Sequence, residues 1–173
     1  LTTNIGILDF QEYFVKHKCN PIVKSINFEG IEKATPSAEF VRSVNKSDAL
    51  IICPSNPFLS VAPILNLPGI STTLRNLKVP RIAISPIVGG KSIRGPAGKI
   101  MSELNLTVSC TEVAKEYIGL CDVFVIDEND RDQVNKIRSL GIDVEVRKTV
   151  MNSEQDKINL ANMILEIIND RQF

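Results

Sequence analysis

Apolar and polar positions along the chain form short segments whose period changes from two residues to between three and four. The short apolar or alternating runs predict β-strands at residues 23–28, 49–53, 81–85, 122–126 and 142–146. Between them, the longer spacing predicts helices at residues 36–44, 71–77, 96–104, 128–140 and after 153. Because strands alternate with helices, we expect an α/β fold: a Rossmann-like layered sheet, mostly parallel, with helices on both faces.

Capping residues mark where several of these helices begin and end. Ser109 and Glu112 have the spacing of a capping box, in which two side chains satisfy free amides at a helix start. Gly141 is expected to end the helix that precedes it, and Ser153 to cap the last one. The apolar residues of the last helix predict one buried face, formed by Ile158, Ala161, Leu165 and Ile168.

Composition and charge exclude several classes of function. The chain has 173 residues, of which 43% are hydrophobic, and 20 Lys and Arg residues balance 20 Asp and Glu residues. This balance leaves no net field to attract nucleic acid or an anionic membrane. The apolar runs fall short of the about 18 residues that a membrane-spanning helix needs, and no signal-peptide pattern opens the chain. We therefore expect a cytoplasmic protein that binds neither nucleic acid nor membrane.

The cysteines and the single histidine do not form a metal or disulfide pattern. Cys19, Cys53, Cys110 and Cys121 are widely spaced without a C-x-x-C pair, and His17 is the only histidine. This spacing does not fit zinc and argues against a disulfide framework. We predict reduced, mostly buried thiols.

Ligands of parallel α/β folds bind at the carboxyl ends of the strands, so the loops after each strand are the candidate sites. The strand at 49–53 runs into Pro54-Ser55-Asn56-Pro57, in which two prolines stiffen the turn. Ser55 and Asn56 offer a hydroxyl and an amide to a polar ligand. Alternatively, these side chains bond only to the backbone of the turn. The pattern alone leaves both interpretations open.

A second loop follows the strand at 81–85 and is rich in glycine and cations. Gly89 and Gly90 expose backbone amides, Lys91 and nearby basic residues add positive charge, and Pro96 opens a helix whose amino end favours anions. This combination suggests a phosphate cradle, although it matches neither a Walker A loop nor the dinucleotide fingerprint. A flexible glycine turn with solvated cations is the alternative.

The third loop begins with Asp127, directly after the strand at 122–126. A carboxylate at this position could bind Mg²⁺ or act in catalysis. More often such an acid caps the helix that follows and complements its dipole. Asp127 is thus the one catalytic candidate, and helix capping is the competing interpretation.

Seven segments taken in order resemble one family, the 2-phospho-L-lactate transferases of deazaflavin coenzyme (F-420) biosynthesis. They are F-Q-E-Y-F-V at 10–15, C-P-S-N-P at 53–57, A-P-I-L at 62–65, L-P-G-I at 67–70, S-P-I-V-G-G-K at 85–91, G-P-A-G-K at 95–99 and V-F-V-I-D-E at 123–128. The similarity runs over nearly the whole chain, and the S-N-P, S-P-I-V-G-G and G-P-A blocks together are specific.

The resemblance implies Mg²⁺-dependent transfer of a 2-phospholactyl or phosphoenolpyruvyl group. The donor is linked to guanosine diphosphate, the acceptor is the terminal hydroxyl of 7,8-didemethyl-8-hydroxy-5-deazariboflavin, and GMP is released. Lys91 would neutralise phosphate charge. The other residues that the resemblance assigns to the donor site are Ser55, Asn56, Pro57, Ser85, Gly89, Gly90, Gly95, Pro96 and Ala97.

The resemblance also bears on the extent of the chain. The family pattern begins with a glycine-rich phosphate loop and acidic residues that the sequence from Leu1 onward does not contain. We therefore expect residues 1–173 to form one α/β domain that is the carboxy-terminal portion of a longer transferase. We expect this portion to be inactive alone, and a homodimer is left open. The alternative function is a non-catalytic regulatory module of the same fold that binds a nucleotide or nucleotide sugar. The S-P-I-V-G-G block favours the transferase.

Overall fold

The computed structural model describes residues 1–171, and its centre is a parallel four-stranded sheet. The strand order is β4-β5-β8-β9, with bounds Leu50–Ile52, Arg81–Ile84, Val123–Asp127 and Asp143–Arg147. All three pairings are parallel, so that Ile51 lies opposite Ile82 and Ala83 opposite Phe124. Each strand falls within a residue or two of a predicted run, which confirms the parallel sheet expected from the apolar pattern.

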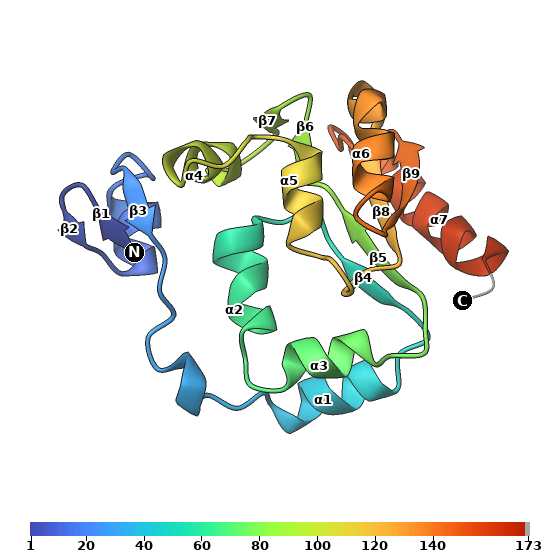
Figure 1. The fold of residues 1–173 in the computed structure, drawn as a ribbon, viewed down its shortest axis with the longest axis horizontal. Coiled ribbons are helices and arrows are strands. Elements are labelled where there is room, and N and C mark those ends of the chain that lie inside the picture. The colour runs from blue at the N-terminus through green and yellow to red at the C-terminus, as the bar shows by residue number, and fades with distance from the viewer. Residues whose placement is uncertain (172–173) are drawn as a thin grey trace.

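Helices cover both faces of this sheet, as predicted. On one face, Ala83, Phe124 and Val144 pack against helices that connect the strands. On the other, Ile82, Ile84, Val123 and Val125 pack against α7. Figure 1 shows α7 on one side of the β4–β5 pair and α2 and α3 on the other. The helices are α1 (Ala38–Asn45), α2 (Ala62–Leu65), α3 (Ile70–Arg75), α4 (Ala97–Glu103), α5 (Cys110–Lys115), α6 (Val134–Arg138) and α7 (Glu154–Asp170).

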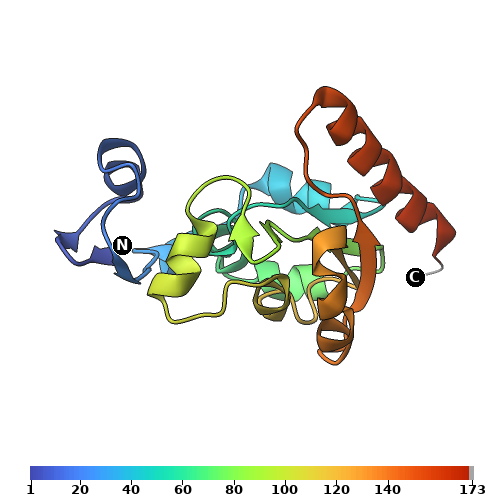
Figure 2. The same cartoon turned by 90° about the horizontal axis from the view of Figure 1, so that it is seen from above.

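The predicted strand at 23–28 forms, but it does not join the parallel sheet. The strand is shorter than predicted: β3 (Val23–Ser25) pairs antiparallel with β1 (Thr2–Thr3), which also pairs with β2 (Gly6–Ile7). Figure 2 shows this small N-terminal sheet at one end of the molecule and α7 at the other. Glu103 of α4 accepts the Val23 amide at 2.9 Å and so links the small sheet to the rest of the fold.

The buried face of α7 differs from the predicted one. Leu160, Ile164 and Ile167 face the sheet, whereas Ile158 and Leu165 are 46% and 54% exposed. Ala161 is also exposed, and Ile168 is half-buried. The helix carries two apolar stripes with the same spacing, and packing on the sheet selects the stripe that periodicity did not single out.

The predicted caps at Gly141 and Ser153 are present, but only the serine half of the box expected at Ser109 and Glu112 forms, and the helix at 128–140 begins differently from expectation. Ser153 and Asp156 form a reciprocal capping box, Ser109 accepts the Glu112 amide at 3.1 Å, and Gly141 adopts φ 81° after α6. The first part of the predicted helix, Glu128–Gln133, is a 3₁₀ segment that turns into α6. The remaining short elements are the hairpin of β6 (Ile87–Val88) and β7 (Lys91–Ser92), the π-helical turns Glu12–Lys16 and Pro57–Val61, and the 3₁₀ turn Ile31–Lys33.

All four cysteines are free, but they differ in exposure. Cys110 and Cys121 are buried, and this burial raises the pKa of each thiol to about 12. Cys19 is half-buried and Cys53 is exposed, so the prediction of mostly buried thiols is wrong for Cys53, which follows the short edge strand β4.

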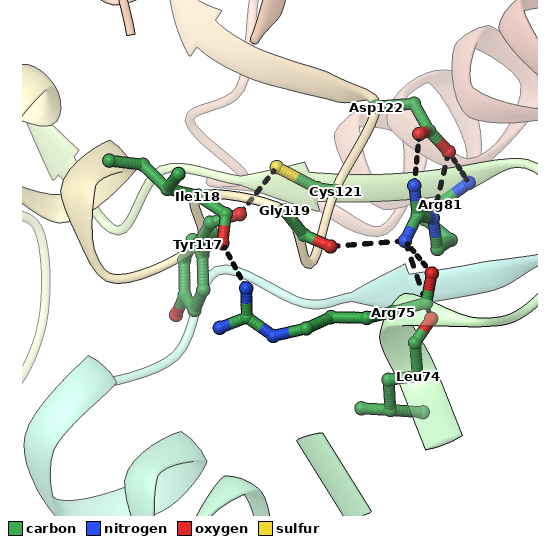
Figure 3. A network of polar contacts seen from close by, with 8 residues as sticks. All are labelled: Leu74, Arg75, Arg81, Tyr117, Ile118, Gly119, Cys121 and Asp122. Atoms are coloured by element: carbon green, nitrogen blue, oxygen red, sulfur yellow. Dashed lines mark hydrogen bonds and ion pairs between the residues drawn. The ribbon is translucent and has the colours of Figure 1, made fainter. Parts of the chain in front are cut away.

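A polar network connects the amino ends of the central strands β5 and β8. The Arg81 guanidinium forms a two-pronged ion pair with Asp122 and donates to the carbonyl oxygens of Arg75 and Gly119 at 3.0 and 3.1 Å (Figure 3). The Arg81 side chain is only 14% exposed. This network joins the starts of β5 and β8 to the end of α3 and the α5–β8 loop.

No helix within residues 1–171 is both long and apolar enough to cross a membrane.

Candidate functional site

A cavity of about 260 Å³ lies at the carboxyl ends of β4, β5 and β9, where the fold predicts a ligand site. It brings together three of the residues expected from the sequence: Asn56, Ser85 and Ala97. The other lining residues are Pro54, Pro86, Val88, Ile93, Arg94, Thr149, Val150, Met151 and Lys157. Three loops that lie far apart in the sequence, together with Lys157 of α7, therefore converge here, and we call this cavity the strand-end pocket.

Asn56 acts as a helix cap and also keeps one polar group free. Its Oδ1 accepts the amides of Phe58 and Leu59 at 2.9 and 3.0 Å, and so caps the turn Pro57–Val61. Its Nδ2 is buried without a hydrogen-bond partner. An unpaired buried donor costs about 1–3 kcal/mol, and native proteins rarely keep one without a reason. Asn56 lines the strand-end pocket, and this amide is a donor that the described residues leave unsatisfied.

Ser85 and Ala97 are buried residues that line the pocket. The Ser85 hydroxyl donates to the Ile87 carbonyl at 2.8 Å and accepts the Ile87 amide at 3.1 Å. The side chain is buried, and its bonding capacity is used by the turn into β6. Ala97 is buried in the first turn of α4. Both residues therefore form part of the pocket wall.

The turn of Gly89 and Gly90 joins β6 to β7 and is held by hydrogen bonds to Asp130. Gly89 and Gly90 adopt φ 56° and 72°, a conformation that glycine reaches without strain. The Gly89 amide donates to both carboxylate oxygens of Asp130, at 3.0 and 3.1 Å, so it is not free to hold a phosphate. Burial raises the pKa of Asp130, and the bond from Gly89 partly offsets that rise. Neither glycine lines the strand-end pocket.

Asp127 is a helix cap whose two oxygens are fully used. Oδ1 accepts the amide and the side-chain Nδ2 of Asn129 at 3.1 and 2.7 Å, and Oδ2 accepts the amide and hydroxyl of Thr149 at 2.9 and 3.1 Å. Burial alone would raise the pKa of Asp127, but these four hydrogen bonds outweigh burial and hold it below its ordinary value. The carboxylate ties the end of β8 to the loop after β9.

The described residues contain no cluster of metal-ligating side chains. Within residues 1–171, there is no group of three or more acidic, histidine or cysteine side chains that could hold a metal ion. Asp127, which is hydrogen-bonded to the lining residue Thr149, has its acceptor sites occupied by Asn129 and Thr149. A hard cation needs several free oxygen ligands, and these carboxylates do not offer them.

Comparison with known proteins assigns the fold to a family. The family model for 2-phospho-L-lactate transferase CofD matches residues 2–170. This chain belongs to that family. The 2-phospho-L-lactate transferase of Methanococcoides burtonii is 36% identical over 165 residues, which are 95% of this chain and 53% of the relative. The enzyme of that name from Methanocaldococcus jannaschii is 36% identical over 162 residues, 94% of this chain and 50% of the relative. The chain thus spans about half the length of the curated relatives it matches.

Solved structures give a more distant likeness, which concerns the fold alone. Two structures of a UPF0052-family protein from Bacillus halodurans match with TM-scores of 0.55 and 0.60 at 17% identity. They cover 94% and 95% of this chain, and 56% and 57% of the other chain. The architecture of this CofD-family chain is therefore shared beyond its curated relatives.

The remaining residues that the family resemblance assigned to the donor site lie outside the strand-end pocket. Ser55 lines a separate groove beside β4, and Pro57 is buried at the start of the turn that Asn56 caps. Gly95 and Pro96 line a shallow hollow next to Lys99. Exposed Lys91 pairs in the hairpin with Val88, which does line the pocket. The roles of these residues stay predictions.

The loop between β9 and α7 contributes pocket residues that the sequence reasoning missed. Thr149, Val150 and Met151 follow the last strand, and Lys157 extends from the second turn of α7. The rule that strand ends hold ligands applies to β9 as to the others and would have pointed to Thr149. Lys157 and Arg94 bring positive charge, although the Lys157 ammonium pairs with Glu154 at 2.8 Å, and no lining residue is acidic. The strand-end pocket therefore suits an anionic, oxygen-rich ligand.

A larger hollow of about 470 Å³ beside the N-terminal sheet is a weaker candidate. It is lined by apolar residues and by two carboxylates, Asp9 and Glu29, without a basic side chain. That charge disfavours an anion, and the hollow lies away from the strand ends of the parallel sheet.

Proposed function

We propose that this chain forms the nucleotide-donor side of a 2-phospho-L-lactate transferase site. The observation that carries the proposal is the CofD family match over residues 2–170. The unpaired Nδ2 of Asn56 supports it, because this donor lies in the C-P-S-N-P motif and at a pocket without acids. The proposal places the reaction in the cytoplasm and names a guanosine diphosphate-linked donor and a deazaflavin acceptor.

The reaction exchanges one phosphorus–oxygen bond for another. The terminal hydroxyl of the deazaflavin attacks the phosphorus that carries the lactyl, or enolpyruvyl, group. The bond from that phosphorus to the bridging oxygen breaks, GMP leaves with the electron pair, and the hydroxyl proton is released. Such transfers depend on positioning and on charge stabilisation more than on a covalent nucleophile.

The residues of the strand-end pocket fit the donor's part in this reaction. Asn56 Nδ2 would donate a hydrogen bond to an oxygen of the nucleotide substrate, and Lys157 and Arg94 would balance the charge of its diphosphate. Lys91, on the hairpin beside the pocket, is proposed to neutralise phosphate charge as well. Mg²⁺ belongs to the proposal as a partner of the diphosphate, but the described residues do not supply its ligands.

A chimera tests this function. This chain would replace the matched region of the Methanocaldococcus jannaschii transferase, and the purified chimera would be incubated with the guanosine-linked donor, the deazaflavin and Mg²⁺. We expect GMP and the phosphorylated deazaflavin to appear in equal amounts by chromatography. A folded chimera that binds GDP without forming product would favour a nucleotide-binding module instead. A folded chimera that does not bind GDP would contradict both functions.

A further inference from the structure

Asp130 is a buried carboxylate without a positively charged partner. Its side chain is only 5% exposed and lies in the 3₁₀ segment Glu128–Gln133. Within residues 1–171, the carboxylate accepts hydrogen bonds only from the Gly89 amide, and no ion pair involves it. Burial raises the pKa of Asp130, and the charges of Asp127 and Asp132 raise it further. A buried charge with so little compensation is costly, so we expect this carboxylate to have a specific role.

The turn that Asp130 holds belongs to a very small hairpin. Strands β6 and β7 have two residues each, and a hairpin of this length is not stable by itself. Its turn, with Gly89 and Gly90, is exposed. Figure 1 shows the hairpin between α4 and α6, next to α5. Within residues 1–171, the two hydrogen bonds to Asp130 are therefore the polar contacts that fix the exposed turn to the body of the fold.

A separate hydrogen bond fixes the other end of the hairpin. The Ser92 hydroxyl, at the end of β7, accepts the amide of Gly98 in α4. The approach is close, because a Cβ at Gly98 would lie 3.0 Å from this hydroxyl oxygen and 3.2 Å from the Val108 side chain. The segment from β6 to α4 is thus held at two points, by Asp130 at the turn and by α4 at the base.

Residues of this segment form one side of the strand-end pocket. Val88 lies directly before the glycine turn, Ile93 and Arg94 follow β7, and all three line the pocket. Arg94 is exposed and forms no ion pair within residues 1–171. Lys157, the other lining cation, pairs with Glu154 at 2.8 Å. The hairpin side therefore carries the lining cation that has no acidic partner among the described residues.

We propose that Asp130 is a positioning residue for anion binding: by holding the Gly89 amide, it places the hairpin so that Arg94 meets an anion in the strand-end pocket. The carboxylate itself does not line the pocket and would not touch the anion. The inference rests on the proposed function only for the identity of that anion, which is the diphosphate of the nucleotide donor. A role in fold stability alone is the competing explanation.

Replacement of Asp130 separates these explanations by the sign of the effect on affinity. Removing a negative charge near an anion site strengthens binding when the geometry is kept, because like charges repel. Losing the positioning contact weakens binding, because Arg94 no longer has a fixed place. Asp130→Asn removes the charge but keeps one acceptor oxygen for Gly89, whereas Asp130→Ala removes both. The positioning role therefore predicts opposite outcomes for two variants that lose the same charge.

Calorimetric titration of the 173-residue chain with inorganic pyrophosphate and with GDP, at low and high salt, measures these outcomes. The variants are Asp130→Asn, Asp130→Ala and Asp130→Leu, the last of which keeps the side-chain volume without an acceptor. Asp132→Ala is the matched control, because Asp132 is an exposed acid of the same 3₁₀ segment. Hydrogen exchange shows whether the Gly89 amide is protected, and thermal unfolding shows that each variant folds.

We expect Asp130→Asn to keep the Gly89 amide protected and to bind both anions at least as tightly as the wild type does. Asp130→Ala and Asp130→Leu should expose that amide and weaken the binding of both anions by about fivefold or more. Their affinities should also depend less on salt, because one cation is no longer engaged. Asp132→Ala should change neither affinity by more than about twofold.

A folded Asp130→Ala or Asp130→Leu chain that binds pyrophosphate as tightly as the wild type would overturn the proposal, whatever its stability. Equal losses of affinity in Asp130→Asn and Asp130→Ala would also overturn it, because the acceptor for Gly89 would then have no effect. A wild-type chain that binds neither anion would overturn it as well. Pyrophosphate binding that follows the expected order without any binding of GDP would uphold the positioning role and contradict the nucleotide-donor function.

Discussion

Replacing Asn56 with serine separates the two roles that the structure gives this side chain. Serine caps helices about as well as asparagine, so the amides of Phe58 and Leu59 retain an acceptor. The buried Nδ2, which has no partner in the protein, is removed. The unfolding free energy of the free protein should therefore stay equal or rise by about 1 kcal/mol, because a buried unsatisfied donor is no longer present.

Ligand affinity should move in the opposite direction. If Nδ2 donates to the nucleotide, its loss costs about 1–3 kcal/mol, a factor of about 5 to 150 in the dissociation constant. Calorimetric titration with GDP measures the affinity, and urea unfolding without ligand measures the stability. Asn56→Ala is the comparison, because it loses the cap as well and should unfold about 1 kcal/mol more easily. Unchanged GDP affinity in Asn56→Ser would refute the ligand role and leave Asn56 as a cap only.

Three further predictions follow from single side chains. Arg81→Met should lower the free energy of unfolding in urea by roughly 3 kcal/mol, because it leaves a partly buried carboxylate and several carbonyl groups unpaired. Arg42→Met, which breaks an exposed ion pair, should lower it by less than about 0.5 kcal/mol. Equal losses would contradict a stabilising role for the Arg81 network. The folded pKa of Asp127 lies below its usual 3.8, so its stabilisation is present above about pH 4 and lost as pH falls through the folded pKa. Asp127→Asn should accordingly flatten the acid limb of stability against pH, and an unaltered limb would argue against these hydrogen bonds. Lys157→Ala should weaken GDP binding more than Lys91→Ala does, because of the two lysines only Lys157 lines the pocket. The loss of affinity should become smaller at high salt. A larger loss in Lys91→Ala would place the phosphates at the hairpin.

The sequence predicted the parallel sheet well, because its central strands are buried on both faces and read as continuous apolar runs. Periodicity failed where two answers had the same spacing. The stripes containing Leu165 and Ile164 on α7 are equally periodic, and only packing on the sheet distinguishes them. The alternation of residues 23–28 likewise predicts a strand but not its partner, which turned out to be β1.

The candidate site was predictable only in part, because its decisive features are contacts between distant segments. Asn56 was identified from its place after a strand. Its Oδ1 caps a helical turn, whereas its Nδ2 has no partner, and residue spacing does not distinguish a capping atom from an unpaired donor. The Gly89 amide was expected to be free, but Asp130, 41 residues later, occupies it. Thr149 enters the pocket region through its bonds to Asp127, a pairing across two strand ends that a linear pattern does not contain.

Hydrogen exchange of the 173-residue chain with and without GDP tests the central claim most directly. The account predicts slower exchange in the presence of GDP at the three loops of the strand-end pocket, residues 54–57, 85–97 and 149–151. Asn56→Ser should reduce that protection while leaving exchange of the central strands unchanged. Protection confined to the N-terminal hollow at residues 1–10 and 26–29, or no protection at saturating GDP, would contradict the assignment of the nucleotide to the strand-end pocket.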